Sequence, residues 1–529
     1  MRKYLTILLM IAILGSACAA RESLRYPPHR WMTDRDNKPI KMPKHTSRYE
    51  FLTGTEERKL FTDFKAVMGV ADQLLISTTS LGMTQEAINV NNFDEVFDST
   101  WFKNGIGRTG EICGPSKTPD VKKKLTVFGF ADLDDPAVFV RDYEGNKFIL
   151  RFDRPGLPGI RTGTEMISHM ILCSVGYNDP DPAIVPLNPS DLIFENGAKV
   201  LTSDLKIVDM SMKRIGDLLK KISGGENKTI RALSMEYNGS RFIGPFEFSG
   251  QRFSDKNDKL PHEHRRELRG YRIFSAFLNN TNTSYLETFD TFSPVNGDLG
   301  YVTHYLFDLS STFGNAGDVK DPKGLNLFGD DVLGWSPGYP NPAYAYQTPR
   351  DAFWAVRILS HFTDKDIDTI VDMGQLPDKK MAKDIADGLK ARRDKLVDYW
   401  VSKFTDIDDA TLTQDADGNA AINLSMIRVM ASPSNHAKGE YRYKLISFTG
   451  EPTLIAWNDL SGSSIGISKE IIERMRDNAV YTLRIEQKRP GTRWYLPPID
   501  IYIKRDYGTV KIYGLLRSYI KDYSPISLP

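Results

Sequence analysis

The spacing of apolar residues changes near residue 410, and this change most limits the folds open to the chain. Before it, long segments carry apolar residues at helical spacing, whereas after it apolar and polar residues alternate as in half-buried strands. We therefore expect residues 411–529 to form an all-β, sandwich-like C-terminal domain. Its clearest strands are predicted at 442–448, 481–486, 499–504 and 509–513.

The residues before this point combine strands with helices. Thr162 and Thr348 stand where two helix N-caps belong, and Pro261 stands where a first helical turn begins. The fold class predicted for the whole chain is therefore α+β. Strands are predicted at 125–130, 137–152 and 304–309, and helices at 60–81, 162–175, 203–222, 261–278, 352–362 and 379–404.

The first eighteen residues have the layout of a bacterial export signal. Arg2 and Lys3 precede an apolar stretch at 4–14, which is too short to span a membrane. The following Leu14-Gly15-Ser16-Ala17-Cys18 resembles a lipobox, with Gly15 where Leu is usual. We expect residues 1–18 to be a lipoprotein signal peptide and Cys18 the lipidation site. Simple secretion with cleavage at Ala17-Cys18-Ala19, or a buried N-terminal helix, are the alternatives.

A lipid anchor would place the protein in the cell envelope, on the periplasmic side of the outer membrane or at the cell surface. Residues 19–84 would then be a tether and N-terminal extension. The 69 Lys and Arg residues balance 68 Asp and Glu, so no nucleic-acid partner is expected. No internal apolar run reaches the ~18 residues that a spanning helix needs, so we expect membrane contact through the anchor alone.

Two further cysteines, Cys113 and Cys173, follow the expected lipidation site. An oxidising compartment would allow them to form a disulfide. Two unrelated thiols, with Cys173 buried in a helix, fit the sequence as well. The sequence leaves both interpretations open.

Three short motifs suggest chemistry, and each has a plainer explanation. In His262-Glu263-His264 with Glu267 the two His fall on different helix faces, so a charged helix start with internal ion pairs is expected rather than a metal site. Gly462-Ser463-Ser464-Ile465-Gly466 matches a nucleophile elbow, but no His follows Ser464, so a flexible turn is expected. The Gly-x-Gly-x-x-Gly string at 105–110 lacks flanking strands, so a loop is expected.

Several segments between about residues 85 and 520 carry a family resemblance. The string Pro261-His262-Glu263-His264-Arg265-Arg266-Glu267-Leu268-Arg269-Gly270 is the most specific; the others are 87–91, 94–102, 148–153, 163–165, 304–308, 311–314 and 512–517. By these segments the chain resembles a family of uncharacterised bacterial lipoproteins with a protein-kinase-like fold, distantly similar to the kinases of toxin–antitoxin systems and spore coats. The resemblance implies a two-lobed domain at 85–410, with an N-lobe at about 85–245 and a C-lobe at about 246–410.

The resemblance also implies a nucleotide-binding pair. A kinase-like site uses a cation on the third strand, held by a helix Glu, to reach the nucleotide phosphates. Arg151 stands where the family has Lys, and it keeps the charge but presents a planar fork in place of a compact ammonium. Glu165 matches the helix Glu.

The expected catalytic loop departs further from the family pattern. Asn282 stands where the Asp that orients the acceptor belongs, and an amide cannot accept that proton. Glu287 replaces a metal-binding Asn and could still hold a cation, and Asp308 matches the second metal ligand. A plainer interpretation makes Arg151 and Glu165 a structural ion pair and bonds Asp308 to the local backbone.

Two functions from different classes are consistent with these positions. We favour an envelope lipoprotein with a degenerate kinase-like domain, which binds or scaffolds an envelope protein or a glycan without catalysis or a cofactor. A secreted protein meets little ATP, which agrees with such a loss. The alternative is an atypical phosphotransferase or nucleotidyl transferase that uses Arg151, Glu165, Glu287 and Asp308 with Mg²⁺ and ATP.

A third function, carbohydrate binding, would use aromatic side chains of the C-terminal domain. Trp457, Trp494 and Tyr495 are the candidates. Positions in the core of a β-sandwich are the plainer explanation for these three residues.

Overall fold

A computed structural model describes residues 38–43, 86–114, 118–121, 123–132, 136–154, 157–202, 207–224, 228–236, 241–315, 327–329, 331–427, 439–447 and 453–519. Within these ranges the fold is mixed, with helices and four sheets. The expected signal peptide, Cys18 and the helix predicted at 60–81 lie outside them. No helix in the described ranges is both long and apolar enough to cross a membrane.

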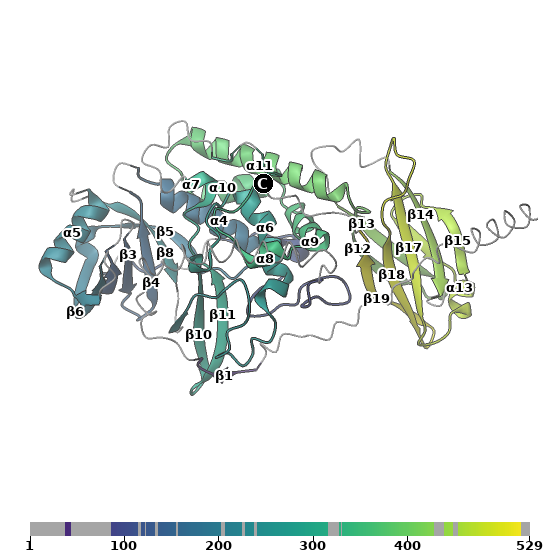
Figure 1. The fold of residues 1–529 in the computed structure, drawn as a ribbon, viewed down its shortest axis with the longest axis horizontal. Coiled ribbons are helices and arrows are strands. Elements are labelled where there is room, and N and C mark those ends of the chain that lie inside the picture. The colour runs from purple at the N-terminus through teal and green to yellow at the C-terminus, as the bar shows by residue number, and fades with distance from the viewer. Residues whose placement is uncertain are drawn as a thin grey trace, which may run out of the picture.

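The molecule is elongated, with one large sheet at one end, two sheets at the other, and most helices between them (Figure 1). The large sheet has seven strands in the order β5-β8-β4-β3-β2-β6-β7. Neighbours run antiparallel except β2 and β6, which are parallel. The strands are β2 (Leu125–Ala131), β3 (Ala137–Arg141), β4 (Lys147–Phe152), β5 (Pro182–Leu187), β6 (Leu192–Leu201), β7 (Ile207–Asp209) and β8 (Ile230–Glu236).

Helix α4 (Ile160–Val175) joins β4 to β5, and almost all of its residues are buried. The prediction that Thr162 caps this helix is wrong, because Gly159 occupies the N-cap. The side chain of Asp153, just after β4, instead accepts hydrogen bonds from the Thr162 backbone amide (2.9 Å) and hydroxyl. Asp153 therefore takes over the capping role from outside the helix.

The helix predicted at 203–222 is shorter than expected. Helix α5 (Met212–Ser223) begins after Ser211, whose side chain accepts a hydrogen bond from the Arg214 amide. The preceding residues Ile207–Asp209 form β7 and pair with β6. Two adjacent apolar residues, Ile207 and Val208, fit both periodicities, and tertiary pairing decides between them.

A four-stranded sheet lies beside the helices, in the order β1-β11-β10-β9. Its first strand comes from the predicted N-terminal extension, and Ile40 packs in a small core with Phe292 and Val302. Of the strand predicted at 304–309, only residues 304–306 are in a strand, because β11 ends at Leu306. The strands are β1 (Ile40–Lys41), β9 (Arg241–Gly244), β10 (Thr288–Asn296) and β11 (Leu299–Leu306).

The helices between the sheets surround the largest hydrophobic core, in which Phe274, Trp354 and Leu389 are completely buried or nearly so. The capping box predicted at Thr348 is confirmed, since Thr348 and Asp351 bond each other's backbone at the start of α9. The helices are α3 (Ile106–Thr109), α6 (Arg266–Leu278), α7 (Thr312–Asn315), α8 (Pro342–Ala345), α9 (Pro349–Leu359), α10 (Asp364–Met373) and α11 (Lys379–Val401), with short 3₁₀ turns at Pro189–Asp191, His262–His264 and Tyr285–Glu287.

The C-terminal strands form two sheets, β12-β13-β16 and β15-β14-β17-β18-β19. Both sheets contribute to one core, for example through Ile422, Leu483 and Ile501. The four strands predicted from alternation are confirmed. Ser464 begins β16, so the flexible turn predicted there is wrong. The elements are β12 (Ile407–Gln414), β13 (Ala420–Met426), β14 (Glu440–Ser447), β15 (Thr453–Asp459), β16 (Ser464–Ile467), α13 (Lys469–Arg474), β17 (Val480–Lys488), β18 (Ile499–Asp506) and β19 (Thr509–Arg517).

Candidate functional site

Arg151 connects two of the carboxylates singled out in the sequence. It lies on β4, with its Nη2 3.2 Å from Oε1 of Glu165 on α4 and its Nη1 3.0 Å from Oδ2 of Asp308 after β11. Glu165 is fully buried and Arg151 is nearly so. One guanidinium therefore bridges a sheet, a helix and the segment after a hairpin.

The electrostatics of this bridge favour a permanently charged Arg151. Burial alone would lower the pKa of the guanidinium, but the carboxylates of Asp308 and Glu165 overcome that effect and raise it. Arg161, one helical turn before Glu165, places its Nε 3.0 Å from the same Oε1. Glu165 is thus shared between two cations, so its charge is well compensated inside the protein.

Asp308 also bonds the chain next to it, as the plainer interpretation predicts. Its Oδ1 accepts hydrogen bonds from the Ser310 backbone amide (3.1 Å) and hydroxyl (2.7 Å). The Asp308 carboxylate therefore has an ion pair on one oxygen and two hydrogen bonds on the other.

The catalytic-loop positions lie beside this group. The carbonyl of Glu287 accepts hydrogen bonds from the amides of Phe307 (2.8 Å) and Asp308 (3.2 Å). The Asn282 side-chain amide donates to Oε1 of Glu287, at 2.7 Å. The five positions named from the sequence thus form one connected series, from Glu165 through Arg151 and Asp308 to Glu287 and Asn282.

This arrangement limits the chemistry available. Asn282 carries no group that can accept a proton from an alcohol, and its amide is engaged with Glu287. Asp308 would have to release Arg151 before its carboxylate could bind a cation. Within the described residues, no group of three or more His, Cys, Asp or Glu side chains could hold a metal ion.

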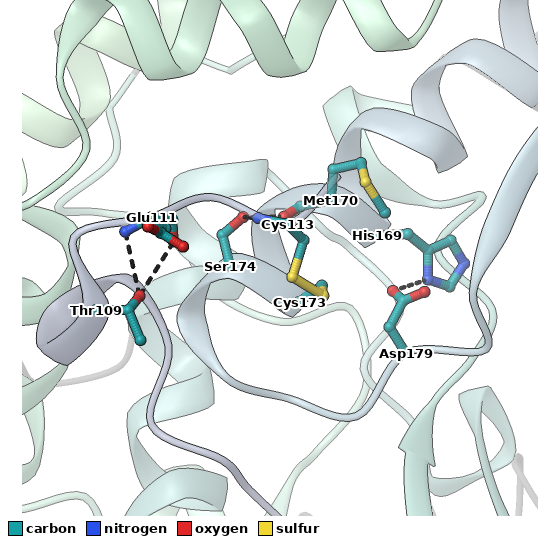
Figure 2. The surroundings of a disulfide bond; sticks show 8 residues. All are labelled: Thr109, Glu111, Cys113, His169, Met170, Cys173, Ser174 and Asp179. Carbon is teal, nitrogen blue, oxygen red and sulfur yellow. Dashed lines mark hydrogen bonds and ion pairs between the residues drawn. A yellow bond between two sulfur atoms is a disulfide. The ribbon is translucent and has the colours of Figure 1, made fainter. Parts of the chain in front are cut away.

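A disulfide fixes the helix that carries Glu165. Cys113 and Cys173 are bonded, with Cα atoms 6.0 Å apart, so the paired alternative left open by the sequence is the one observed (Figure 2). The Cys113 amide also donates to the Ser174 hydroxyl, at 2.9 Å. Cys173 lies about two turns beyond Glu165 on α4, so the bridge anchors the C-terminal half of that helix to the segment at 111–114.

The glycine-rich string at 105–110 packs against the backbone of the same helix, α4. It forms the one-turn helix α3 rather than an open loop. A Cβ on Gly105 would lie 2.1 Å from the Ser174 carbonyl oxygen, so only glycine allows this close approach to α4. The string is explained by backbone packing.

The His-Glu-His segment does not open a helix, so the predicted charged helix start is wrong, although both His side chains make polar contacts within the chain. A 3₁₀ turn at His262–His264 is followed by extended backbone at Arg265, and α6 begins at Arg266. His262 bonds Asp258 (2.8 Å), while His264 accepts from Arg269 (2.7 Å). Burial and the charge of Arg269 lower the pKa of His264, which suits its role as an acceptor.

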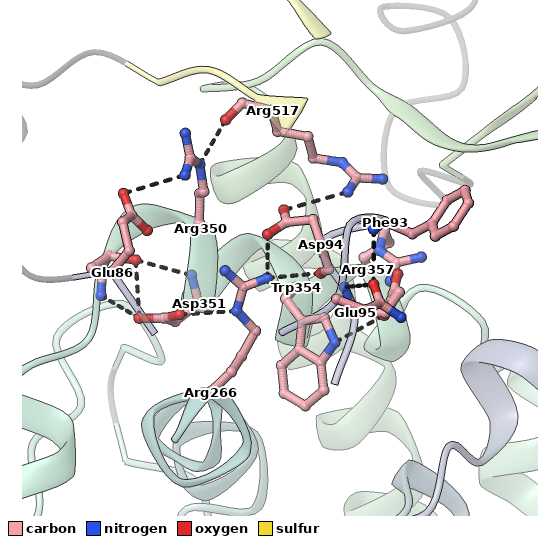
Figure 3. Close-up of polar contacts among 12 residues, drawn as sticks. Glu86, Phe93, Asp94, Glu95, Arg266, Arg350, Asp351, Trp354, Arg357 and Arg517 are labelled. Carbon is pink, nitrogen blue, oxygen red and sulfur yellow. Dashed lines mark hydrogen bonds and ion pairs between the residues drawn. The ribbon is translucent and has the colours of Figure 1, made fainter. Parts of the chain in front are cut away.

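The following arginines join distant parts of the chain (Figure 3). Arg266 lies 2.6 Å from Oδ1 of Asp94 and 3.0 Å from Oδ1 of Asp351 at the start of α9. Burial would raise the pKa of Asp94, but Arg266, Arg350 and Arg517 together lower it to about 2. These buried ion pairs give Arg266, in the Pro261–Gly270 string, a structural role.

The tail aromatics are not core residues. Trp494 is 67% exposed, so the core interpretation is wrong for it. Trp457 and Tyr495 are half-buried and lie on either side of one side chain, with the Arg442 guanidinium carbon 4.2 Å and 3.7 Å from their ring centroids. Cation–π contacts hold this group together on the surface of the five-stranded sheet.

Sequence reasoning missed Arg161 and the contact between Arg151 and Asp308. The i,i+4 spacing of Arg161 and Glu165 could have indicated the first, since such pairs meet on one helix face. The second joins residues far apart in the chain, and spacing carries no signal for it.

No protein-family model, curated protein or solved structure matches the chain.

Proposed function

We propose that the protein is an envelope lipoprotein whose kinase-like domain has lost catalysis and serves to bind or scaffold an envelope protein or glycan. In this proposal residues 85–410 are the two lobes, and 411–529 are a sandwich-like domain. Cys18 carries the lipid anchor. The resemblance supplies the family, and the geometry of the charged series supplies the argument against catalysis.

The strand order supports a kinase-like first lobe. Strands β2, β3, β4, β8 and β5 are neighbours in that order, with the cation on β4 and its Glu on the helix that follows. Protein kinases place a Lys on the third strand and pair it with a Glu on the next helix in the same way. The hairpin β10–β11 lies between Glu287 and Asp308, which spaces the two expected metal ligands as a kinase-like second lobe would.

One observation carries the loss of catalysis. Arg151 forms ion pairs with both Glu165 and Asp308. The cation expected to bind phosphates and the carboxylate expected to bind a metal therefore neutralise each other. Binding a nucleotide with its metal would have to break a buried ion pair, which costs several kcal/mol. Asn282 occupies the position of the Asp that would orient the acceptor, and its amide cannot accept a proton from an acceptor hydroxyl.

An assay for group transfer tests the proposal. The purified chain is incubated with ATP labelled at the γ- or the α-phosphate, in Mg²⁺ or Mn²⁺, with itself and mixed envelope proteins as acceptors. We expect label transfer equal to that of the Asp308→Asn variant, since neither protein can activate an acceptor. Transfer by the wild type that Asp308→Asn abolishes, with its melting temperature preserved, would contradict the proposal.

The transferase alternative retains one observation in its favour. Asp308 lies 3.0 Å from the Arg151 guanidinium, and its backbone amide donates to the Glu287 carbonyl, so the two expected metal-binding residues are neighbours through the backbone. If the assay shows transfer, Glu287→Gln should reduce it as strongly as Asp308→Asn does. Glu195→Gln, which changes an exposed ion pair with Arg141, is the matched control and should have no effect.

A further inference from the structure

A cavity of about 40 Å³ lies among the helices, away from the Arg151 series. It lies between α6, α11 and the segments before α9. Leu396, Tyr399 and Trp400 of α11 line one side, and Trp335 lines another. By volume it holds about three water molecules, and because it is partly open to solvent, a longer ligand would extend out of it.

One cation, Arg272 of α6, lines this otherwise largely apolar cavity. Among the described residues it has no hydrogen bond, ion pair or cation–π contact, unlike the two arginines that precede it on α6. Arg266 and Arg269 both pair with Asp351, for example. Burial lowers the pKa of Arg272, with Tyr344 opposing the effect only weakly. A guanidinium stays charged even so, and a mostly buried charge without a partner is unfavourable.

Two of the other polar side chains of the lining are already engaged, whereas the buried Trp335 Nε1 has no hydrogen-bond partner among the described residues. The Gln347 side-chain amide donates to the Arg269 carbonyl at 2.8 Å, and the Thr348 hydroxyl bonds Asp351 in the α9 capping box. No carboxylate is among the lining residues. Arg272 and the Trp335 indole N–H are therefore both available to a ligand, and the guanidinium offers a planar fork suited to a carboxylate.

We propose that this cavity binds a small monocarboxylate with a short apolar tail, whose carboxylate pairs with Arg272 and whose tail lies against Trp335 and Trp400. The charge selects an anion, and the aromatic lining and small volume select a tail of a few carbon atoms. The site is separate from the charged series of the proposed function, so either proposal can fail without the other.

Isovalerate is the probe, and isovaleramide is its uncharged equivalent of nearly the same shape. Titration of the full chain by ligand-observed NMR should show saturable isovalerate binding with a Kd of about 1 mM, an ordinary affinity for a ligand of this size. Isovaleramide should bind at least about tenfold more weakly, because it cannot pair with the guanidinium.

Two variants separate the charge from the cavity. Arg272→Gln should weaken isovalerate binding at least about tenfold and leave isovaleramide unchanged. Ala276→Leu, which fills the lining from α6 without changing charge, should weaken both ligands and keeps the test decisive if Arg272→Gln does not fold. Absence of saturable isovalerate binding to the wild type, equal binding of the amide, or binding unaffected by both variants would overturn the proposal.

Discussion

At the scale of single residues, charge compensation decides what the candidate site can do. Arg151, Glu165 and Arg161 are buried together, and Asp308 closes the series. The sequence predicted a structural Arg151–Glu165 pair and a local bond for Asp308, and both are confirmed. It could not predict that one guanidinium holds both acids, because that depends on how β4, α4 and the end of β11 meet.

Glu165→Gln should lower the free energy of unfolding by ~3 kcal/mol, since it leaves Arg151 and Arg161 buried with less opposite charge. Denaturant titration followed by circular dichroism would measure this change. Glu195→Gln removes the carboxylate of the exposed Arg141 pair and should cost less than about 1 kcal/mol. Equal losses in the two variants would show that the buried series is not compensated as described.

At the scale of elements, the predicted helices and strands are correct where neighbouring residues determine the backbone, and wrong where tertiary packing determines it. The Thr348 capping box and the alternating strands β14, β17, β18 and β19 appear as predicted, because they depend on neighbouring residues. Pro261 did not start a helix, since the bonds of His262 to Asp258 and of His264 to Arg269 favour a separate turn. Ser464 lies in a strand because β13 is there to pair with it.

The disulfide should stabilise α4 as an element. It closes a loop of 60 residues, so Cys113→Ser with Cys173→Ser should cost roughly 2–4 kcal/mol of stability. Hydrogen exchange of the α4 amides should quicken in this double variant more than exchange in α11. Dithiothreitol should reproduce the effect in the wild type and change nothing further in the variant. Unchanged α4 protection after complete reduction would contradict the anchoring role.

At the scale of the whole molecule, one polar network joins the N-terminal segment, the helices and the C-terminal sheets (Figure 3). Arg357 of α9 pairs with Glu95 and, at 2.7 Å, with Asp408 of β12. The Arg350 side chain donates to the Arg517 carbonyl at 2.7 Å. The sequence indicated two regions divided near 410, but these contacts join residues between 51 and 262 positions apart and leave no trace in its local patterns.

This network predicts that the helical region and the C-terminal sheets unfold together. The wild type should give one calorimetric transition, whereas Arg357→Ala should lower its midpoint by several degrees or split it, because Glu95 and Asp408 lose their shared cation. Lys380→Ala, which removes an exposed pair with Asp384, is the control and should leave the trace unchanged. An Arg357→Ala trace identical to the wild type would show that the two regions are not coupled here.

Because Arg151 is already satisfied by Glu165 and Asp308, we expect nucleotides not to stabilise the protein, and a thermal-shift panel measures this. The purified chain is melted with ATP, GTP, CTP or UTP at about 1 mM, each with Mg²⁺, Mn²⁺ or chelator. We expect that no nucleotide raises the melting temperature in a metal-dependent way. A metal-dependent rise of about 3 °C or more that Asp308→Asn removes would contradict it.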